Sequence, residues 1–435
     1  MQDSKRQAWH STVSALRGSP GLARLTIVRF ASQFGDGMFQ AALGGAILFN
    51  PERHADPVAI AAGFAVLLLP YSVIGPFAGA LLDRWDRRLV LVWANALRGV
   101  FILAAATVLV TGGPQTPLML LALAAVGVSR FVLAGVSASL PHVVAQSWLV
   151  PVNSVLATVG SAVSAAGAGA AVTTIAFVGT GDLGSGIAVA LGASGSVIGA
   201  VAAGRFARQA LGPDGARPRA VVRTIVAGLR TGATAVWEAP GVAAAMIGIG
   251  AHRIVFGIDT LIMVLVLRDT EHETSLPGGF AGFGVAVAAT AIGMLIAAIV
   301  APFLIPRLGR PRTVTVGLIG AAVVQLLFVT TVTQGPLLIA AFLLGLAGQT
   351  IKLTGDAAMQ IDIDDARRGQ VFALQDTVFN IGFLAALAVA AFVVAPDGRS
   401  PALAVAGAAV YILGVIGVLA IRRYRIDRYR IDPGR

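Results

Sequence analysis

The ten residues from Gly79 to Arg88 read Gly-Ala-Leu-Leu-Asp-Arg-Trp-Asp-Arg-Arg. They separate two long apolar runs, Val58–Leu82 and Leu89–Thr111. Each run is long enough to cross a lipid bilayer, which takes about 20 apolar residues. The charged link between the runs must lie in water, and its arginines are typical of a cytoplasmic loop. The stretch therefore predicts two membrane-spanning helices joined by a short cytoplasmic turn.

The composition indicates a membrane protein along the whole chain. Of 435 residues, 57% are hydrophobic and 12% are charged, and the mean hydropathy is +0.83. A soluble domain carries about 25% charged residues. The net charge of +11 would suggest nucleic-acid binding in a soluble protein. Here the arginines collect at the ends of apolar segments, so the membrane surface explains them better and we expect no nucleic-acid partner.

Twelve apolar segments can each form a transmembrane helix. They are roughly Leu22–Leu48, Val58–Leu82, Leu89–Thr111, Leu118–Val143, Val150–Val178, Gly184–Gly204, Gly241–Leu267, Phe280–Ile305, Thr313–Val332, Leu337–Met359, Gln370–Val394 and Pro401–Ile421. The sequence thus predicts an all-α membrane protein with twelve transmembrane helices in two six-helix bundles.

The longest gap between the spans divides the chain into halves. We expect a cytoplasmic N-terminal segment, a first bundle, a central cytoplasmic loop, a second bundle and a basic cytoplasmic tail, at residues 1–21, 22–204, 205–240, 241–421 and 422–435. Within the central loop, Ala220–Trp237 has helical spacing of arginine and apolar residues. This segment either lies along the membrane surface or forms a simple linker helix.

Basic residues gather at every second junction, counted from the N-terminal segment, whereas Arg53, Arg268 and Arg399 lie at the others. The positive-inside rule then places both termini in the cytoplasm. Of 32 basic residues only Lys5 and Lys352 are lysines, which suggests a GC-rich bacterial genome. The polar first 21 residues and the long apolar run after them do not fit a cleaved signal peptide. We expect a multi-pass protein of the bacterial inner membrane.

The turn after the second span carries a recognisable pattern. It resembles the signature between the second and third helices of the major facilitator superfamily, here formed by Gly79, Asp83, Arg84, Arg87 and Arg88. The family usually has glycine where this chain has Asp86. The alternative is an ordinary basic turn that obeys the positive-inside rule.

Other stretches resemble one branch of that superfamily. The similarity is to macrolide exporters, enterobactin exporters and lysophospholipid flippases, and it lies in Ser137–Ala157, Ala366–Gln375, Gly35-Asp36 and the run Asn95-Ala96-Leu97-Arg98. The resemblance covers essentially the whole chain. It implies two pseudo-symmetric bundles that expose a central site alternately to the two sides of the membrane.

Ionisable side chains inside the predicted spans are functional candidates, because the bilayer makes each of them costly. They are Arg29, Asp36, Arg98, Arg130, His252, Arg253, Asp259, Lys352, Asp356 and Asp376.

Asp36 is the first candidate for proton coupling or substrate binding. It lies about 14 residues into its helix, or roughly 21 Å at about 1.5 Å per residue, which is inside the hydrocarbon. Gly35 and Gly37 beside it allow another helix or a ligand to approach closely. A carboxyl group withdrawn from water can load and release protons near neutral pH. The alternative is a static contact with Arg29, two turns earlier on the same face.

Arg98 and Arg130 are cations within the third and fourth spans. Arg130 precedes Gly135 much as the family's fourth-helix arginine precedes a glycine in a motif associated with proton coupling. A fixed arginine near Asp36 would let substrate or movement modulate protonation. The alternative for each arginine is a structural ion pair that locks the first half.

The second half has its own candidates. Asp259 corresponds to Asp36, and its alternative roles are pairing with Arg253 or capping a helix end. Lys352 and Asp356 are four residues apart on one helix, so they can neutralise each other or line a cavity.

Asp83 has a different role by resemblance. In the family, this carboxylate engages the N-terminus of the eleventh helix and a neighbouring arginine and holds the cytoplasmic side closed. The dipole of that helix would stabilise such an anion. The five motif residues are therefore expected to form a conformational latch.

Other chemistry finds little support. The chain has no cysteine, its five histidines are scattered, and no Gly-x-x-x-x-Gly-Lys-Ser/Thr motif is present. We expect no metal, no cofactor and no enzymatic activity. The resemblance implies a secondary transporter, with proton-coupled efflux of amphipathic or hydrophobic molecules as the main hypothesis. The alternatives are a lysophospholipid flippase and a transport-inactive receptor or scaffold; the expected partners are a small-molecule or lipid substrate, protons and membrane lipid, with the protein a monomer.

Overall fold

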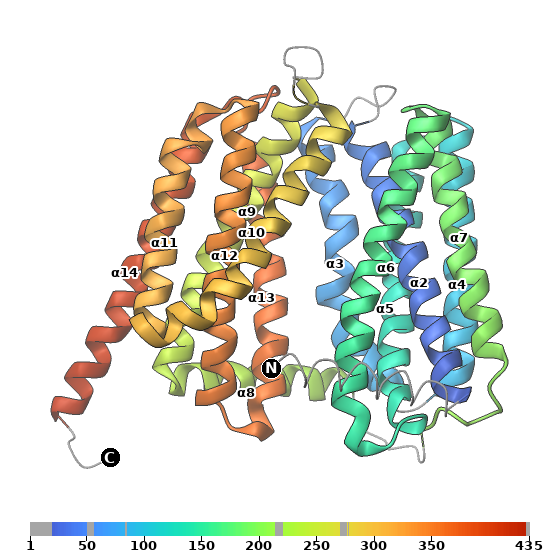
Figure 1. Cartoon of the computed structure of the whole chain (residues 1–435), viewed down its shortest axis with the longest axis horizontal. Helices are drawn as coiled ribbons and strands as arrows, with labels where there is room; N and C mark the ends of the chain where they lie inside the picture. Colours follow the sequence, from blue (N-terminus) through green and yellow to red (C-terminus); the bar gives the residue numbers. More distant parts are fainter. Residues whose placement is uncertain are drawn as a thin grey trace. The chain divides into compact units, whose positions relative to one another are not determined.

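The computed structural model describes residues 20–49, 56–82, 85–213, 221–269, 276 and 278–431. Every regular element in these ranges is a helix (Figure 1). The chain divides into two compact units, Met1–His54 with Ala65–Thr224, and Ala55–Phe64 with Ile225–Arg435.

The helices of the first half coincide with the first six predicted spans. They are α2 (Pro20–Gly44), α3 (Pro57–Leu82), α4 (Arg87–Val110), α5 (Gln115–Ser139), α6 (Leu149–Val178) and α7 (Asp182–Gly204). Short turns extend them: the π-helical η1 (Gly45–Phe49) follows α2, and the 3-10 turns η2 (Leu140–His142) and η3 (Gln146–Trp148) join α5 to α6.

The helices of the second half coincide with the other six spans. They are α9 (Pro240–Asp269), α10 (Gly279–Leu308), α11 (Arg310–Leu327) with the 3-10 turn η4 (Val329–Thr331), α12 (Gln334–Asp362), α13 (Asp365–Ala391) and α14 (Pro401–Ile431). Within the described residues, ten helices are long and apolar enough to cross a membrane, and α2 and α3 complete the predicted twelve. The prediction of an all-α membrane protein is confirmed, and the predicted count of twelve transmembrane helices is compatible with the structure.

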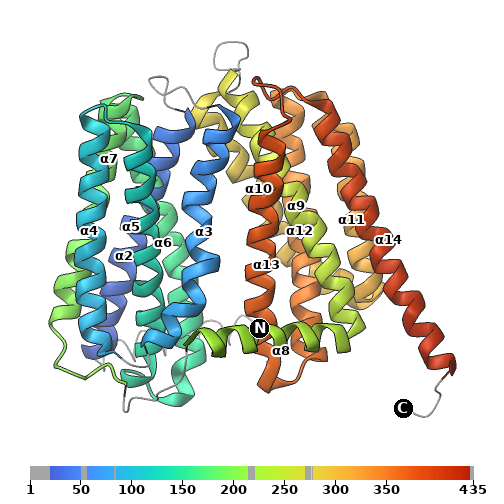
Figure 2. The same cartoon turned by 180° about the vertical axis from the view of Figure 1, so that it is seen from behind.

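Helix α8 (Val221–Glu238) occupies the segment predicted as a linker or surface helix. Its part from Ile225 onward belongs to the second unit, where it runs crosswise to the end of α13 (Figure 2). A Cβ atom on Gly232 would lie 2.7 Å from the Gln370 carbonyl oxygen, so the two helices touch backbone to backbone. Arg367 of α13 also pairs with Glu238 at 2.7 Å.

Helix α2 is held between α6 and α7 through glycines. A Cβ atom on Gly35 would lie 2.5 Å from the Gly192 carbonyl oxygen of α7, and one on Gly195 would collide with the Ala31 carbonyl. On the other flank, a Cβ atom on Gly37 would collide with the Ser164 carbonyl of α6. Small residues are what allow membrane helices to approach this closely. These contacts fix the rotation of α2 about its axis.

The turn between α3 and α4 is anchored by its charged residues. Asp86 caps α4, because its Oδ1 accepts from the Arg88 backbone N–H at 3.0 Å, and its φ of −55° needs no glycine. Arg87 is buried and donates to the carbonyls of Leu82 and Ala138 at 3.2 and 2.8 Å. The cap explains how aspartate serves where the family pattern usually has glycine.

Candidate functional site

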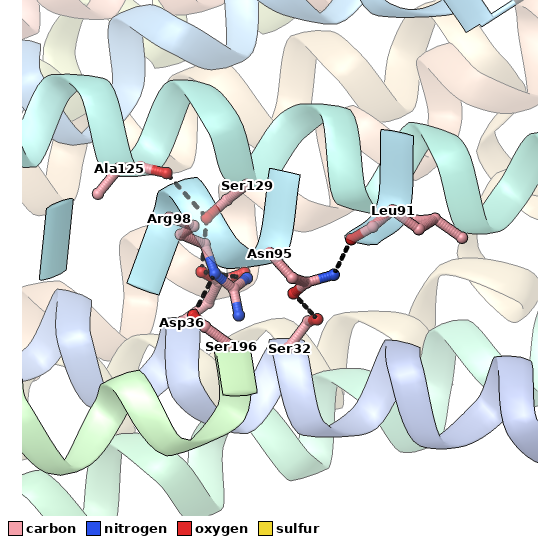
Figure 3. A network of polar contacts seen from close by, with 8 residues as sticks. All are labelled: Ser32, Asp36, Leu91, Asn95, Arg98, Ala125, Ser129 and Ser196. Atoms are coloured by element: carbon pink, nitrogen blue, oxygen red, sulfur yellow. Dashed lines mark hydrogen bonds and ion pairs between the residues drawn. The ribbon is translucent and has the colours of Figure 1, made fainter. Parts of the chain in front are cut away.

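The rotation of α2 decides where Asp36 points. Successive helical residues are about 100° apart, so Gly35 facing α7 and Gly37 facing α6 leave Asp36 on the face between them. Helices α4 and α5 supply its partners there (Figure 3). The glycines that sequence reasoning associated with close approach thus also aim the carboxylate.

Asp36 forms an ion pair with Arg98 of α4. The distance from Arg98 Nη1 to Asp36 Oδ1 is 3.2 Å, and Ser129 Oγ of α5 donates to the same oxygen at 2.7 Å. Arg98 Nε also donates to Ser196 Oγ of α7 at 2.9 Å (Figure 3). The Arg98 side chain has no exposed surface, whereas that of Asp36 keeps 16%. Four helices therefore meet at this pair, and only its acidic member is reached from outside.

A second polar contact lies beside the ion pair. Ser32, one turn before Asp36, donates to Asn95 Oδ1 at 3.1 Å, and Asn95 Nδ2 donates to the Leu91 carbonyl at 2.8 Å (Figure 3). Asn95 is fully buried. These bonds connect α2 to α4 and help to hold Asp36 opposite Arg98.

A cavity in the first unit opens beside Asp36, and the space between its walls, open solvent included, is about 490 Å³. Its described lining is mostly polar and comprises Arg29, Ser32, Gln33, Asp36, Gln40, Ser129, Arg130, Val132, Leu133, Val136 and Ser164. The structure thus brings three of the sequence-predicted ionisable residues, on α2 and α5, to one hollow.

Arg29 does not contact Asp36, which was the alternative considered for that carboxylate. Its Nε instead faces Gln33 Oε1 at 3.4 Å, one turn away. Its Nη1 atom is buried and donates to no acceptor among the described residues. Arg130 lies on the α5 side of the same cavity.

Asp259, the counterpart of Asp36 in the second unit, has a different kind of partner. Gln325 Nε2 of α11 donates to Asp259 Oδ1 at 2.6 Å, so Asp259 pairs with an amide and not with Arg253. Gln325 is fully buried, and Gln325 Oε1 and Asp259 Oδ2 are both buried without a hydrogen-bond partner in the described part of the chain. Nothing in the spacing of Asp259 and Gln325 along the chain signalled this pair.

Three further contacts lie in the second unit. His252 Nδ1 lies 2.9 Å from the hydroxyl of the fully buried Tyr411. Lys352 and Asp356 of α12 pair at 2.6 Å, and Gln375 of α13 donates to Asp356 at 3.4 Å. The Lys352–Asp356 contact is the i,i+4 pair that the sequence suggested. The Lys352 side chain is 38% exposed.

The residues of the conformational motif are only partly described. Gly79 lies in α3, and Arg87 and Arg88 lie in the first turn of α4. Arg88 Nη2 donates to the Gly204 carbonyl at 2.9 Å, which ties α4 to the end of α7. Asp83 and Arg84 fall outside the described residues, so the latch stays a prediction.

Sequence reasoning missed the serines and the amides around the two acids. Ser129, Ser196 and Gln325 carry no charge, so they do not stand out in an apolar segment. Small polar side chains in membrane helices also commonly hydrogen-bond to the backbone of their own helix. Ser129 Oγ does make such a contact, to the Ala125 carbonyl at 3.1 Å. Only their positions in three dimensions distinguish these residues.

In the described part of the chain, long apolar helices with charged side chains inside each unit indicate a multi-pass membrane protein of the transporter class. No protein-family model matches the chain. Two proteins described as uncharacterized MFS-type transporters, from Mycobacterium tuberculosis and Mycobacterium bovis, are each 43% identical over 409 residues, which is 92% of this chain and 91% of the relative. The chain therefore belongs to the major facilitator superfamily, and it is a transporter and not an enzyme.

Solved structures agree on the fold. The nucleoside transporter NupG aligns with a TM-score of 0.67 at 15% identity, covering 93% of this chain and 100% of NupG. A peptide transporter of the POT type aligns with a TM-score of 0.64 at 17% identity, covering 93% of this chain and 95% of that protein. At these identities the likeness extends to the fold alone.

Proposed function

We propose that this transporter works by alternating access as a proton-coupled secondary carrier of amphipathic or hydrophobic small molecules in a bacterial inner membrane. Both termini lie in the cytoplasm, and the direction is export. The resemblance to macrolide and enterobactin exporters supports the direction. The observation that carries the proposal is the Asp36–Arg98 pair at the edge of the polar cavity.

The pair has the properties that a coupling site needs. Asp36 keeps access to the cavity while Arg98 has none. As long as Asp36 is ionised, the two charges compensate each other inside the unit. A proton on Asp36 removes that compensation and leaves the Arg98 cation buried, which is unfavourable at low dielectric. Protonation thus changes the electrostatic energy of contacts that join α2, α4, α5 and α7.

The test is transport by purified protein in liposomes under an imposed pH gradient. Ethidium, phenylbutanesulfonate and labelled lysophosphatidate are offered in parallel, with internal pH followed by a trapped indicator. The native protein should move one of them in step with protons, and Asp36→Asn should uncouple the two fluxes. The matched control is Asp56→Asn, because Asp56 is an exposed cap of α3 and asparagine caps as well.

Each outcome tests one part of the proposal: the role of Asp36, the kind of transporter or the substrate class. Coupled movement that survives in Asp36→Asn would remove Asp36 from the coupling role. Movement of the lipid alone would indicate that the protein is a flippase and not a carrier of soluble molecules. Absence of movement for all three, with the protein folded, would contradict the proposed substrate class.

A further inference from the structure

The cavity beside Asp36 carries more positive than negative charge. Among its described lining residues, Arg29 and Arg130 are cations and Asp36 is an anion. Asp36 is already paired with a third arginine, Arg98, which lies behind it. Asp36 is therefore compensated within the protein wall, and its charge does not balance the Arg29 cation at the cavity.

Arg29 is held in place but incompletely satisfied. Arg29 is 7% exposed, and its Nη1 atom is buried with no hydrogen-bond partner among the described residues. Its hydrogen bond to Gln33 is long, with 3.4 Å between Arg29 Nε and Gln33 Oε1. Guanidinium donors that are withdrawn from water and left open cost free energy unless an acceptor meets them, and a carboxylate, sulfonate or phosphate meets them best.

The rest of the lining suits a molecule with an anionic end and an apolar body. Gln33, Gln40 and Ser164 add neutral donors near the arginines. On the α5 side, Val132, Leu133 and Val136 form an apolar edge. Polar groups that fix orientation beside an apolar wall are typical of small-molecule sites.

We infer that the cavity of the first unit binds the oxyanion group of an amphipathic substrate, with Arg29 as its main charge partner and Arg130 as a second. The inference rests on the proposed function only in taking this cavity as the substrate site. It narrows the substrate class to anions and disfavours cationic molecules. The shared chemistry is the oxyanion, whether a water-soluble amphiphile or a lysophospholipid supplies it.

Binding is measured on the full-length protein in lipid nanodiscs by calorimetry, with empty nanodiscs subtracted. The probes share one apolar body and differ in the polar end: phenylbutanesulfonate, phenylbutanol and phenylbutyltrimethylammonium. Sulfonate stays ionised at all usable pH values, so the comparison does not depend on the probe's own titration. A lipid arm compares lysophosphatidate with monoacylglycerol, which lacks the phosphate.

The sulfonate should bind at least tenfold more tightly than the alcohol, since a charge-assisted contact contributes about a factor of ten or more. The substitution Arg29→Gln should remove that preference, and Arg29→Lys should restore part of it. Arg24→Gln is the matched control, because Arg24 lies on the same helix and donates to the Arg205 carbonyl at an exposed position. If Arg29→Gln fails to fold, Arg130→Gln and the probe ranking of the native protein still give the answer.

Equal binding of the alcohol or the cation, or unchanged sulfonate affinity in folded Arg29→Gln, would overturn the inference. Preference for lysophosphatidate over the sulfonate, with the same dependence on Arg29, would assign the oxyanion to a lipid headgroup. Calorimetry involves no proton gradient, so anion-selective binding without gradient-driven transport would contradict the proposed coupling and leave the anion site standing.

Discussion

The Asp36–Arg98 pair allows a quantitative test by a double-mutant cycle. The single substitutions are Asp36→Asn and Arg98→Gln, and the third variant combines them. Each single change leaves one charge of the pair without its partner, whereas the combination leaves neither. The unfolding free energy of the combined variant should therefore fall by less than the sum of the two single effects.

The magnitude follows from the burial of the two side chains. Removing one partner of a buried ion pair costs about 3–5 kcal/mol when the other charge stays behind. Asparagine at position 36 keeps an oxygen for Ser129 and Arg98, so we expect about 2–3 kcal/mol for Asp36→Asn. Asp36 is 16% exposed and retains Ser129, so the charge left by Arg98→Gln is less costly. The coupling between the two sites should be about 1–2 kcal/mol, within the range for contacting residues.

The assay is equilibrium unfolding of purified protein in mixed micelles, followed by circular dichroism over a denaturant series. Ser129→Ala provides a scale for a single hydrogen bond to the carboxylate. Effects that add within about 0.5 kcal/mol would show that the two side chains do not interact energetically, and the electrostatic argument for Asp36 would be refuted.

Three further predictions concern packing and other polar contacts. Gly37→Ala should destabilise by about 1–3 kcal/mol, because its Cβ would meet the Ser164 backbone, while Gly44→Ala on the same helix, with nothing within 4 Å, should be neutral or slightly stabilising in the same unfolding assay. Tyr411→Phe should lower the unfolding free energy by about 1 kcal/mol through loss of the His252 contact, and no change would mean that the contact contributes nothing. Lys352→Gln should change stability by less than about 1 kcal/mol, since its pair with Asp356 is partly exposed; a larger loss would indicate that Lys352 has a second role.

Helix positions could be predicted because a membrane helix must satisfy its backbone hydrogen bonds within itself. Length and hydropathy then suffice to locate it. The boundaries were less exact where charged residues continue a helix beyond the apolar run. Helix α13, for example, begins at Asp365 and not near Gln370, and its first turn includes Arg367 and Arg368.

The partners of the charged residues could not be predicted in the same way. The sequence placed Asp36 and Arg29 on one helix face, but residues seven apart lie roughly 10 Å apart along the axis. Asp36 reaches Arg98 because glycines on α2 and α7, together with the Ser164 backbone of α6, set the rotation of α2. That rotation depends on which small residues meet across three helices, and a single sequence does not contain this information.

The charge of the substrate and the direction of proton movement are linked through Asp36. A proton on this acid adds one positive charge beside the cavity, so an anion binds more tightly and, by reciprocity, a bound anion favours protonation. Export of an anion in exchange for protons therefore requires that Asp36 loses its proton before the anion binds, so that the two do not occupy the site together. The membrane potential also drives an anion out of a cell whose interior is negative. At 100 mV it favours exit by about 2.3 kcal/mol per charge, without any contribution from protons. Sulfonate moving with the proton flux in liposomes would favour co-transport over export by exchange, and sulfonate moving against it would show that Asp36 does not bind its proton next to the anion.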